Sequence, residues 1–198
     1  MHDYFDVFGL PRKLAVDGEE LRRRFYDLSR RHHPDFHQLA SDSEQAEALA
    51  HSALVNRAYR ALRDPRARVE HVIALEEGRE TAEGATAKPR APMDLLEEMM
   101  EVQESLEEAR SSGLDDAARA RLGGERQRLL ARREQTDRQI LARCAEWDAA
   151  AEDGGDRARL LRWFKEALAA RAYLTTVIDD LSEALGEDRE THAAHRGH

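Results

Sequence analysis

The feature that most constrains this chain is the helical spacing of its apolar residues, which recurs along most of the 198 residues. Leu21, Phe25 and Leu28 stand at i, i+4 and i+7, the spacing that places side chains on one face of an α-helix. Charged residues make up 36% of the sequence and aromatic residues only 6%, which is typical of long solvated helices rather than of sheets. The sequence therefore predicts an all-α fold of small bundles, in which each helix buries one apolar stripe.

The N-terminal segment, residues 1–76, begins with two predicted helices. The first is short, because its aromatic opening is stopped by Gly9 and Pro11. Asp17 offers an N-cap for the second helix, and Glu20 follows three residues later in the spacing of a capping box.

Two more helices are predicted in the remainder of this segment. Ser41 and Glu44 repeat the capping-box spacing at the start of the third helix. Asp64 followed by Pro65 combines an N-cap with a proline at the first helical position, so a fourth helix begins there. The apolar positions of the two helices are Val55, Ala58, Tyr59 and Leu62, and then Val69, Val72, Ile73 and Leu75.

The C-terminal half predicts a separate domain. Residues 77–91 are rich in Gly, Ala, Thr and Pro and are predicted to form a linker, whereas residues 188–198 are predicted to be a disordered tail. Residues 92–187 carry three amphipathic patterns with short connections, which favours an antiparallel three-helix bundle. Gly154–Gly155 should separate its last two helices, and Gly123–Gly124 should weaken or kink the middle one. The expected core positions are Leu95, Met99, Val102, Leu106 and Ala109; Leu122, Leu129, Ile140, Cys144 and Trp147; and Phe164, Ala167, Leu174, Ile178, Leu181 and Leu185.

Charge and cysteine content narrow the possible partners. A net charge of −9 disfavours binding to nucleic acid, which depends on Lys and Arg contacts to phosphate. Residues 22–31 nevertheless carry five arginines, whereas the segment from Glu97 to Glu108 is strongly acidic, so two different protein partners are expected. The single cysteine, Cys144, can form neither an internal disulfide nor a cysteine-based metal or iron–sulfur site, and we expect no cofactor.

The sequence shows no apolar stretch long enough to cross a bilayer, so we expect no membrane partner. Its first residues also lack the basic and apolar pattern of a secretory signal. A reducing compartment suits a chain with one cysteine, and cytoplasmic localisation is expected.

His33-Pro34-Asp35 follows the predicted basic helix directly. Pro34 ends this helix, because proline disfavours the helical conformation in the residue before it. His33 is thereby placed near a helix C-terminus, where the partial negative charge favours a cationic imidazole. Asp35 is left in a loop, where its carboxylate can receive an arginine of a partner. Away from the apolar stripe of the helix lie Arg23, Tyr26 and Arg30.

This arrangement resembles the J-domain over residues 1–76. The resemblance rests on the opening that ends in Gly9-Leu10-Pro11, the basic helix, the His-Pro-Asp tripeptide and the pattern Val55-Asn56-Arg57-Ala58-Tyr59-Arg60-Ala61-Leu62. It implies that the partner is the nucleotide-binding domain of a DnaK/HscA-class chaperone, whose ATP hydrolysis the J-domain promotes without performing chemistry itself, so the chain is not an enzyme. The chaperone-binding residues that it implies are His33, Pro34, Asp35, Arg23, Tyr26 and Arg30.

The predicted helix from residue 92 carries a second apolar row, Leu96 and Met100, beside its core stripe. The row could widen the core stripe, or it could form an exposed patch suited to an apolar and basic partner. Acidic residues ring it at Glu97, Glu101, Glu104 and Glu108. Trp163 points about a quarter turn away from Phe164 and could either cap the core or join that patch.

The whole of residues 1–186 resembles HscB, the J-domain co-chaperone of iron–sulfur biogenesis. The resemblance rests on Phe8-Gly9-Leu10-Pro11, Asp64-Pro65 with Arg68-Val69-Glu70-His71, Leu95 to Glu104, Trp147-Asp148-Ala149-Ala150 and Leu161-Arg162-Trp163. It implies an IscU-type scaffold as the client, bound by Leu96, Met100, Glu101, Glu104, Glu108 and Trp163. Glu97 departs from the family at a position that can be apolar.

Three other interpretations remain open at this point. A J-domain protein could serve a different client, or the tripeptide could be only a turn in a structural helical adaptor. His32, His33, Asp35 and His37 could in principle hold a metal, although their spacing matches no standard zinc pattern. The sequence shows no nucleophile–base arrangement or phosphate loop that would indicate catalysis.

Overall fold

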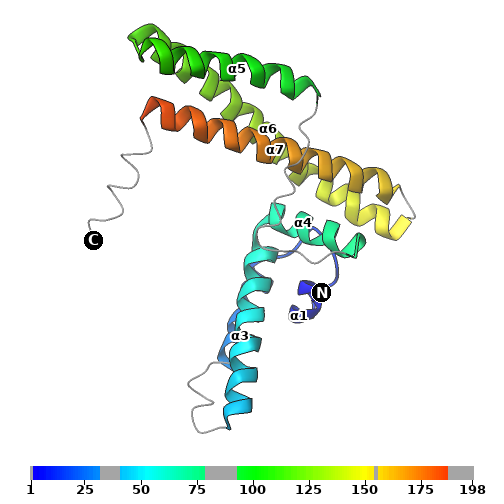
Figure 1. Cartoon of the computed structure of the whole chain (residues 1–198). Helices are drawn as coiled ribbons and strands as arrows, with labels where there is room; N and C mark the ends of the chain where they lie inside the picture. The colour runs from blue at the N-terminus through cyan, green and yellow to red at the C-terminus, as the bar shows by residue number, and fades with distance from the viewer. Residues whose placement is uncertain (1, 32–40, 79–92, 154–155, 187–198) are drawn as a thin grey trace. The chain divides into compact units, whose positions relative to one another are not determined.

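The computed structural model describes residues 2–31, 41–78, 93–153 and 156–186. Within these ranges every regular element is an α-helix, as the sequence predicted (Figure 1). The helices are α1 (Tyr4–Phe8), α2 (Gly18–Arg31), α3 (Asp42–Arg63), α4 (Pro65–Glu76), α5 (Met93–Ser112), α6 (Asp116–Asp153) and α7 (Arg157–Leu185). The Gly154–Gly155 break, the predicted tail and the linker beyond Gly78 lie outside the described residues.

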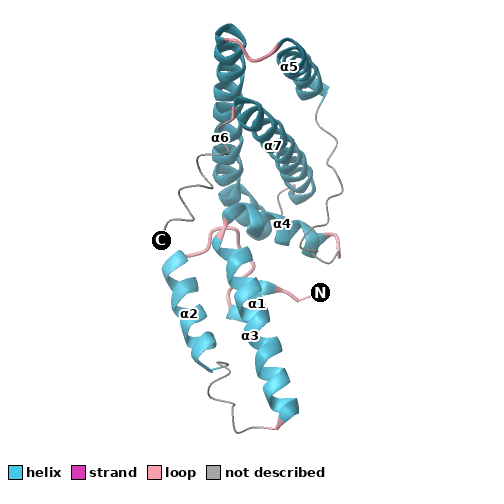
Figure 2. Cartoon of the chain, turned by 60° about the vertical axis from the view of Figure 1, so that its left-hand side comes forward, coloured by secondary structure: helices cyan, strands magenta, loops and turns pink. Residues whose placement is uncertain are grey.

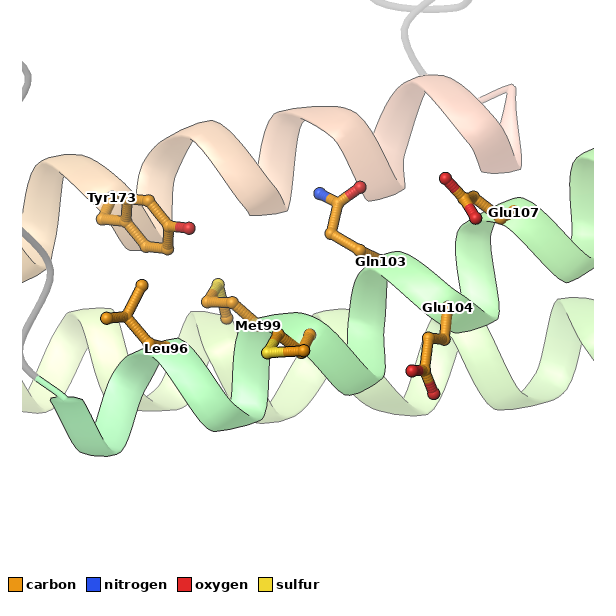
Figure 3. Close-up of a pocket in the computed structure, with 7 residues that line it drawn as sticks. Leu96, Met99, Gln103, Glu104, Glu107 and Tyr173 are labelled. Carbon is orange, nitrogen blue, oxygen red and sulfur yellow. The ribbon is translucent and has the colours of Figure 1, made fainter.

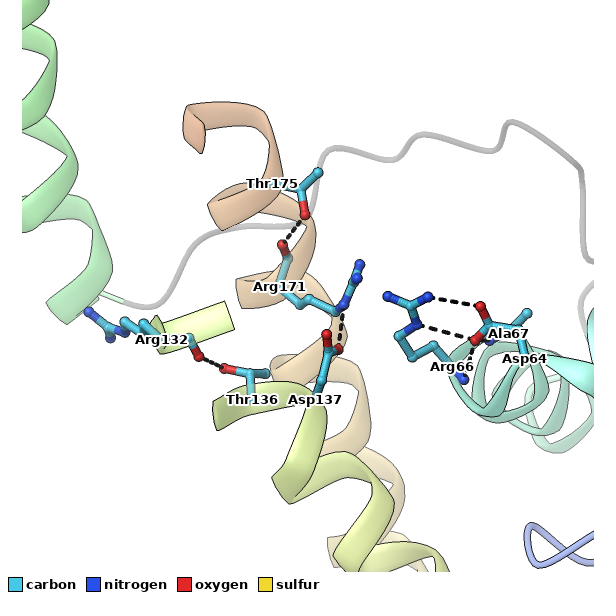
Figure 4. A network of polar contacts seen from close by, with 8 residues as sticks. All are labelled: Asp64, Arg66, Ala67, Arg132, Thr136, Asp137, Arg171 and Thr175. Carbon is cyan, nitrogen blue, oxygen red and sulfur yellow. Dashed lines mark hydrogen bonds and ion pairs between the residues drawn. The ribbon is translucent and has the colours of Figure 1, made fainter. Parts of the chain in front are cut away.

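The helices begin where the sequence placed their caps. The side chain of Asp17 accepts from the backbone N–H groups of Glu19 and Glu20 at the start of α2. Ser41 and Glu44 form a complete capping box at the start of α3. Asp64 caps α4 and also accepts from the side chain of Arg66, whose hydrogen bonds hold the pKa of Asp64 below its usual value (Figure 4).

The chain divides into two compact units. The N-terminal unit comprises the described residues of Met1–Ala85 and Leu141–Leu161, and the C-terminal unit those of Thr86–Ile140 and Arg162–His198. Residues 141–161 thus group with the N-terminal helices, whereas the sequence had assigned them to the segment 92–187. The sequence-derived boundaries, residues 1–76 and 92–187, differ from the units in this respect and remain predictions of which segments fold independently.

The core of the N-terminal unit forms where α1 and α2 pack against α3. Figure 2 shows α2 and α3 side by side as a hairpin. The ring of Phe25 stacks on that of Tyr59 with centroids 4.1 Å apart, which joins the two helices. The fully buried side chains around this contact include Phe5, Leu21, Val55, Ala58 and Leu62.

A polar clamp joins residues 141–161 to the N-terminal helices. The carboxylate of Asp148 accepts hydrogen bonds from the backbone N–H groups of Leu14, at 2.7 Å, and Ala15, at 2.8 Å. The buried guanidinium of Arg68 donates to the carbonyls of Leu14 and Leu62. Both sets of bonds satisfy backbone groups of the connection between α1 and α2. Those of Asp148 also explain why this part of α6 packs with the N-terminal unit.

The C-terminal unit is a bundle of α5 with parts of α6 and α7. Arg119 of α6 donates to the carbonyl of Leu185 on α7, and Arg126 donates to the hydroxyl of Ser182. Further along, Arg171 of α7 donates to Asp137 of α6 (Figure 4). As residue numbers rise along α6, the numbers of the partners on α7 fall, so these helices are antiparallel. The core contains all five predicted positions of α5, with Leu122 and Leu129 of α6 and Leu174, Val177, Ile178, Leu181 and Leu185 of α7.

The predicted weak point of α6 is not seen as a break. The helix runs from Asp116 to Asp153 through Gly123 and Gly124. A Cβ atom added at either glycine would meet nothing within 4 Å, so neither glycine is required by close packing. The helix continues because Leu122 and Leu129 on either side are fully buried in the core.

Candidate protein-interaction surfaces

The basic face of α2 consists of Arg23, Tyr26 and Arg30, which are all exposed. Their spacing of three and four residues places them on one side of the helix, while Leu21 on another side is buried. Tyr26 is 63% exposed, so this aromatic residue is accessible to a partner. The structure therefore brings the three predicted residues together on one accessible surface.

Arg24, next to the basic face, has a different role. Its guanidinium donates to the carbonyl oxygens of Phe8, at 2.6 Å, and Gly9, at 2.8 Å, and pairs with Glu20 at 2.6 Å. These bonds hold α2 against the C-terminal end of α1. Gly9 is required there, because its φ of 60° is left-handed and an added Cβ would lie 3.2 Å from Arg24 Nη1. The sequence analysis counted Arg24 among the basic residues and missed this contact.

His33, Pro34 and Asp35 lie outside the described residues. The described part of α2 ends at Arg31, and α3 starts at Asp42, so the basic face of α2 leads to the tripeptide. The expectations for these three residues stay predictions, and the alternative of a metal site at His32, His33, Asp35 and His37 also falls outside the described residues. In the ranges that the structure does describe, no group of three His, Cys, Asp or Glu side chains is placed to hold a metal ion.

The second apolar row of α5 is exposed. Met100 is 65% exposed and Leu96 38%, whereas Leu95 and Met99 beside them are buried. We call Leu96 and Met100 the α5 patch. Of the two geometries considered for this row, the structure has the exposed one, and the core is complete without it.

An open depression of about 230 Å³ lies beside the α5 patch, between α5 and α7. Figure 3 shows Tyr173 of α7 opposite Leu96 and Met99, while Gln103 and Glu107 extend toward α7 further along the groove. The residues that line this α5–α7 depression are Leu96, Met99, Met100, Gln103, Glu104, Glu107 and Tyr173. Sequence reasoning missed Gln103 and Glu107, although successive steps of four residues from Met99 place them on one face of α5. It also missed Tyr173, which only the packing of α7 on α5 brings to this face.

The acidic residues around the α5 patch differ in their surroundings. Glu97, Glu101 and Glu104 are exposed on α5. Glu108 instead pairs with Arg121 of α6 at 2.7 Å. Its carboxylate therefore already has a cation beside it and is less available to a partner than the other three.

Trp163 lies apart from the α5–α7 depression. It is half-buried and packs edge-on against Phe164, with ring centroids 5.5 Å apart. It precedes Tyr173 by ten residues, roughly 15 Å along the axis of α7. The structure therefore does not place Trp163 among the residues that line the depression.

Arg68 and Cys144 are buried groups whose pKa values depart from their usual ones. Burial lowers the pKa of Arg68 and raises that of the Cys144 thiol. The electrostatic interaction between these two groups partly offsets both pKa shifts. Arg157 lies over the ring of the buried Trp147, 4.1 Å from its centroid, and contacts Glu76 at 3.3 Å.

In the part of the chain that the structure describes, no helix has the length and apolar character needed to cross a membrane.

The chain is similar to known proteins in both sequence and structure. Residues 3–71 match the family model of the DnaJ domain, so the match contains the basic face of α2 and the His-Pro-Asp tripeptide. Chaperone HscB from Vibrio cholerae has a similar structure, with 28% sequence identity, coverage of 91% of this chain and 99% of that one, and a TM-score of 0.55. Human co-chaperone protein HscB is also similar, with 25% identity, coverage of 92% of this chain and 81% of that one, and a TM-score of 0.60.

Proposed function

Because the chain is a J-domain co-chaperone of the HscB type, we propose that it stimulates the ATPase of an HscA/DnaK-class chaperone and delivers an IscU-type iron–sulfur scaffold to it. The observation that carries this proposal is the basic face of α2, exposed and leading to His33-Pro34-Asp35 inside a DnaJ-domain match. The proposal assigns no catalytic step to this chain, and it places the work in the cytoplasm, a reducing compartment that suits a single cysteine.

The chaperone would be recognised by charge and then shifted in conformation. Arg23 and Arg30 would dock on an acidic surface of the nucleotide-binding domain, which speeds encounter more than it adds affinity. Tyr26 between them can bury its ring against the same surface. His33 and Asp35 would then favour the hydrolysis-competent state of the chaperone, because a ligand shifts an equilibrium by its differential affinity for the two states.

The scaffold would bind on the C-terminal unit. The α5 patch offers exposed apolar surface that the core does not need, and Met100 can adapt to a partner. Glu101 and Glu104 beside it favour a partner with basic groups near its apolar contact. Glu108 and Trp163 belong to the proposed surface by family resemblance alone, since the structure pairs the first with Arg121 and sets the second apart.

The proposal is tested by measuring chaperone ATP hydrolysis in four mixtures: chaperone alone, with this chain, with the scaffold, and with both. We expect stimulation by the chain alone and a further increase when the scaffold is added, because delivery raises the local concentration of the client. Replacing Leu96 and Met100 by alanine should remove the scaffold-dependent increase and keep the stimulation by the chain alone.

Two results would separate the alternatives. Stimulation without any scaffold-dependent increase, at scaffold concentrations that saturate the chaperone, indicates a J-domain protein with a different client. No stimulation at all would leave a helical adaptor in which the tripeptide is a turn. Glu166→Gln, an exposed substitution on α7 outside the α5–α7 depression, serves as the control for the double variant.

A further inference from the structure

We propose that the α5–α7 depression is part of the scaffold-binding surface, and that Tyr173 determines its specificity. The inference rests on the proposed function, since it assumes that the scaffold binds beside the α5 patch. The occupant that fits is a segment of the scaffold that presents one apolar side chain and, further along, a Lys or Arg.

The apolar end of the depression is built from both helices. Leu96 and Met99 approach from α5, and the ring of Tyr173 faces them from α7 (Figure 3). Met100 of α5 also lines this end. Tyr173 is half-buried and packs against the core of the C-terminal unit. Its ring is therefore held in place before a partner arrives, which reduces the entropy lost on binding.

Polar groups at the depression have no partner within the described residues. The structure gives the hydroxyl of Tyr173, the amide of Gln103 and the carboxylate of Glu107 no hydrogen bond or ion pair among those residues. By contrast, Glu108 one residue later is paired with Arg121. A hydroxyl and an amide that can each donate and accept would discriminate a segment with matching polar groups from one without them.

The charge of the depression selects the sign of the occupant. Among the described residues, its lining includes Glu104 and Glu107 and no basic side chain. Glu101 adds a third carboxylate on the exposed side of α5. An acidic segment would meet like charges here, whereas a Lys or Arg would be attracted by carboxylates that carry no ion pair in the described structure.

The spacing along α5 sets the pattern in the occupant. Met100 and Glu107 are seven residues apart on one helix, about 10 Å along its axis. A helical segment lying along the depression would present its cation about two turns from its apolar side chain, and an extended segment about three residues from it.

The test is calorimetric titration of the full chain with the IscU-type scaffold, at low and at moderate salt. Tyr173→Ala should weaken binding roughly tenfold or more, as expected for truncation of an aromatic contact at the centre of an interface. Tyr173→Phe keeps the ring and should weaken binding by roughly two- to tenfold through the lost hydroxyl. Glu107→Gln should flatten the salt dependence of the dissociation constant. The control Glu166→Gln should leave the dissociation constant unchanged at both salt concentrations.

Each outcome has a definite meaning. The first outcome is that binding is lost with Leu96→Ala and Met100→Ala but is unaffected by Tyr173→Phe and Glu107→Gln. This result overturns the inference and leaves the proposed function standing. No binding by the wild-type chain overturns the delivery function and this inference together. Self-association of the wild-type chain that Tyr173→Ala abolishes would assign the depression to a second copy and contradict the inference. Thermal unfolding of each variant shows whether a loss of affinity is a loss of fold.

Discussion

Neighbouring arginines on α2 differ in their contacts. Arg23 is exposed and forms an ion pair with Glu20 at 3.8 Å, whereas Arg24 donates to two backbone carbonyls of the α1 end. Arg24 stands three residues after the buried Leu21, on the apolar stripe, and that position is the signal that its side chain turns inward. We therefore expect Arg24 to contribute to stability, and Arg23 to be available to a partner.

Replacing each arginine by alanine tests this division. Arg24→Ala should lower the free energy of unfolding by about 2 kcal/mol, because it removes charge-assisted hydrogen bonds to carbonyls near the core. Arg23→Ala should leave the free energy of unfolding within about 0.5 kcal/mol and reduce chaperone ATPase stimulation. Urea unfolding and ATPase assays on both variants check this. Equal effects of the two substitutions on stability would contradict it.

His71 is a titratable group enclosed by the N-terminal unit. Its ring stacks on Tyr4 with centroids 4.1 Å apart, and its Nε2 accepts from the backbone N–H of Tyr4 at 3.0 Å. Its Nδ1 has no hydrogen-bond partner among the described residues. Burial lowers the pKa of His71 below its usual value, and the carboxylate of Asp3 offsets this only in part. The neutral ring is thus the form that the fold requires.

This predicts a loss of stability in acid. Between the lowered folded pKa and the unfolded pKa of about 6.5, the unfolded chain binds more protons than the folded one, so stability falls as the pH falls through that window. Urea unfolding at pH 7.5 and pH 5.5 should show this loss in the wild-type sequence and a smaller loss in His71→Phe. A Trp163→Phe background leaves Trp147 as the fluorescent reporter of the N-terminal unit. An equal loss in both chains would refute the assignment to His71.

At the scale of elements, α6 is the helix that the sequence described least completely. Its apolar stripe predicted the buried positions Cys144 and Trp147 correctly, because a helical stripe is a local property. The partner of that stripe is not local: Asp148 bonds Leu14 across 134 residues. No periodicity in the sequence reports such a contact, so residues 141–161 were assigned to the bundle.

Asp148→Asn tests the clamp between α6 and the α1–α2 connection. The neutral amide accepts more weakly than a carboxylate, and its NH2 group cannot accept from a backbone N–H, so the variant should lose about 1–3 kcal/mol of stability in the N-terminal unit. The buried Cys144 one turn away should then react faster with an alkylating agent in the folded protein. Glu146→Gln, an exposed change two residues earlier, should alter neither quantity. Alkylation at the wild-type rate would show that Asp148 does not hold this contact.

Across the whole molecule, the sequence predicted the features that depend on short-range rules. The caps at Asp17, Ser41 and Asp64 are confirmed, because a cap is decided within one helical turn. The all-α class is confirmed as well. The α5–α7 depression could not be predicted in the same way, since Tyr173 reaches it only through the packing of two helices separated in sequence. Gly123–Gly124 was expected to weaken α6, and tertiary packing outweighs that local preference.

The proposed function depends on one event, which is the activation of a chaperone by the tripeptide that follows α2 in the sequence. The most direct test is the ATPase rate of an HscA/DnaK-class chaperone in the presence of His33→Gln, with His2→Gln as the control and circular dichroism as the measure of helical content. We predict that His33→Gln abolishes stimulation with unchanged helical content, while His2→Gln stimulates as the wild-type chain does. Stimulation by His33→Gln at the wild-type level would contradict the assignment of this chain as a J-domain activator.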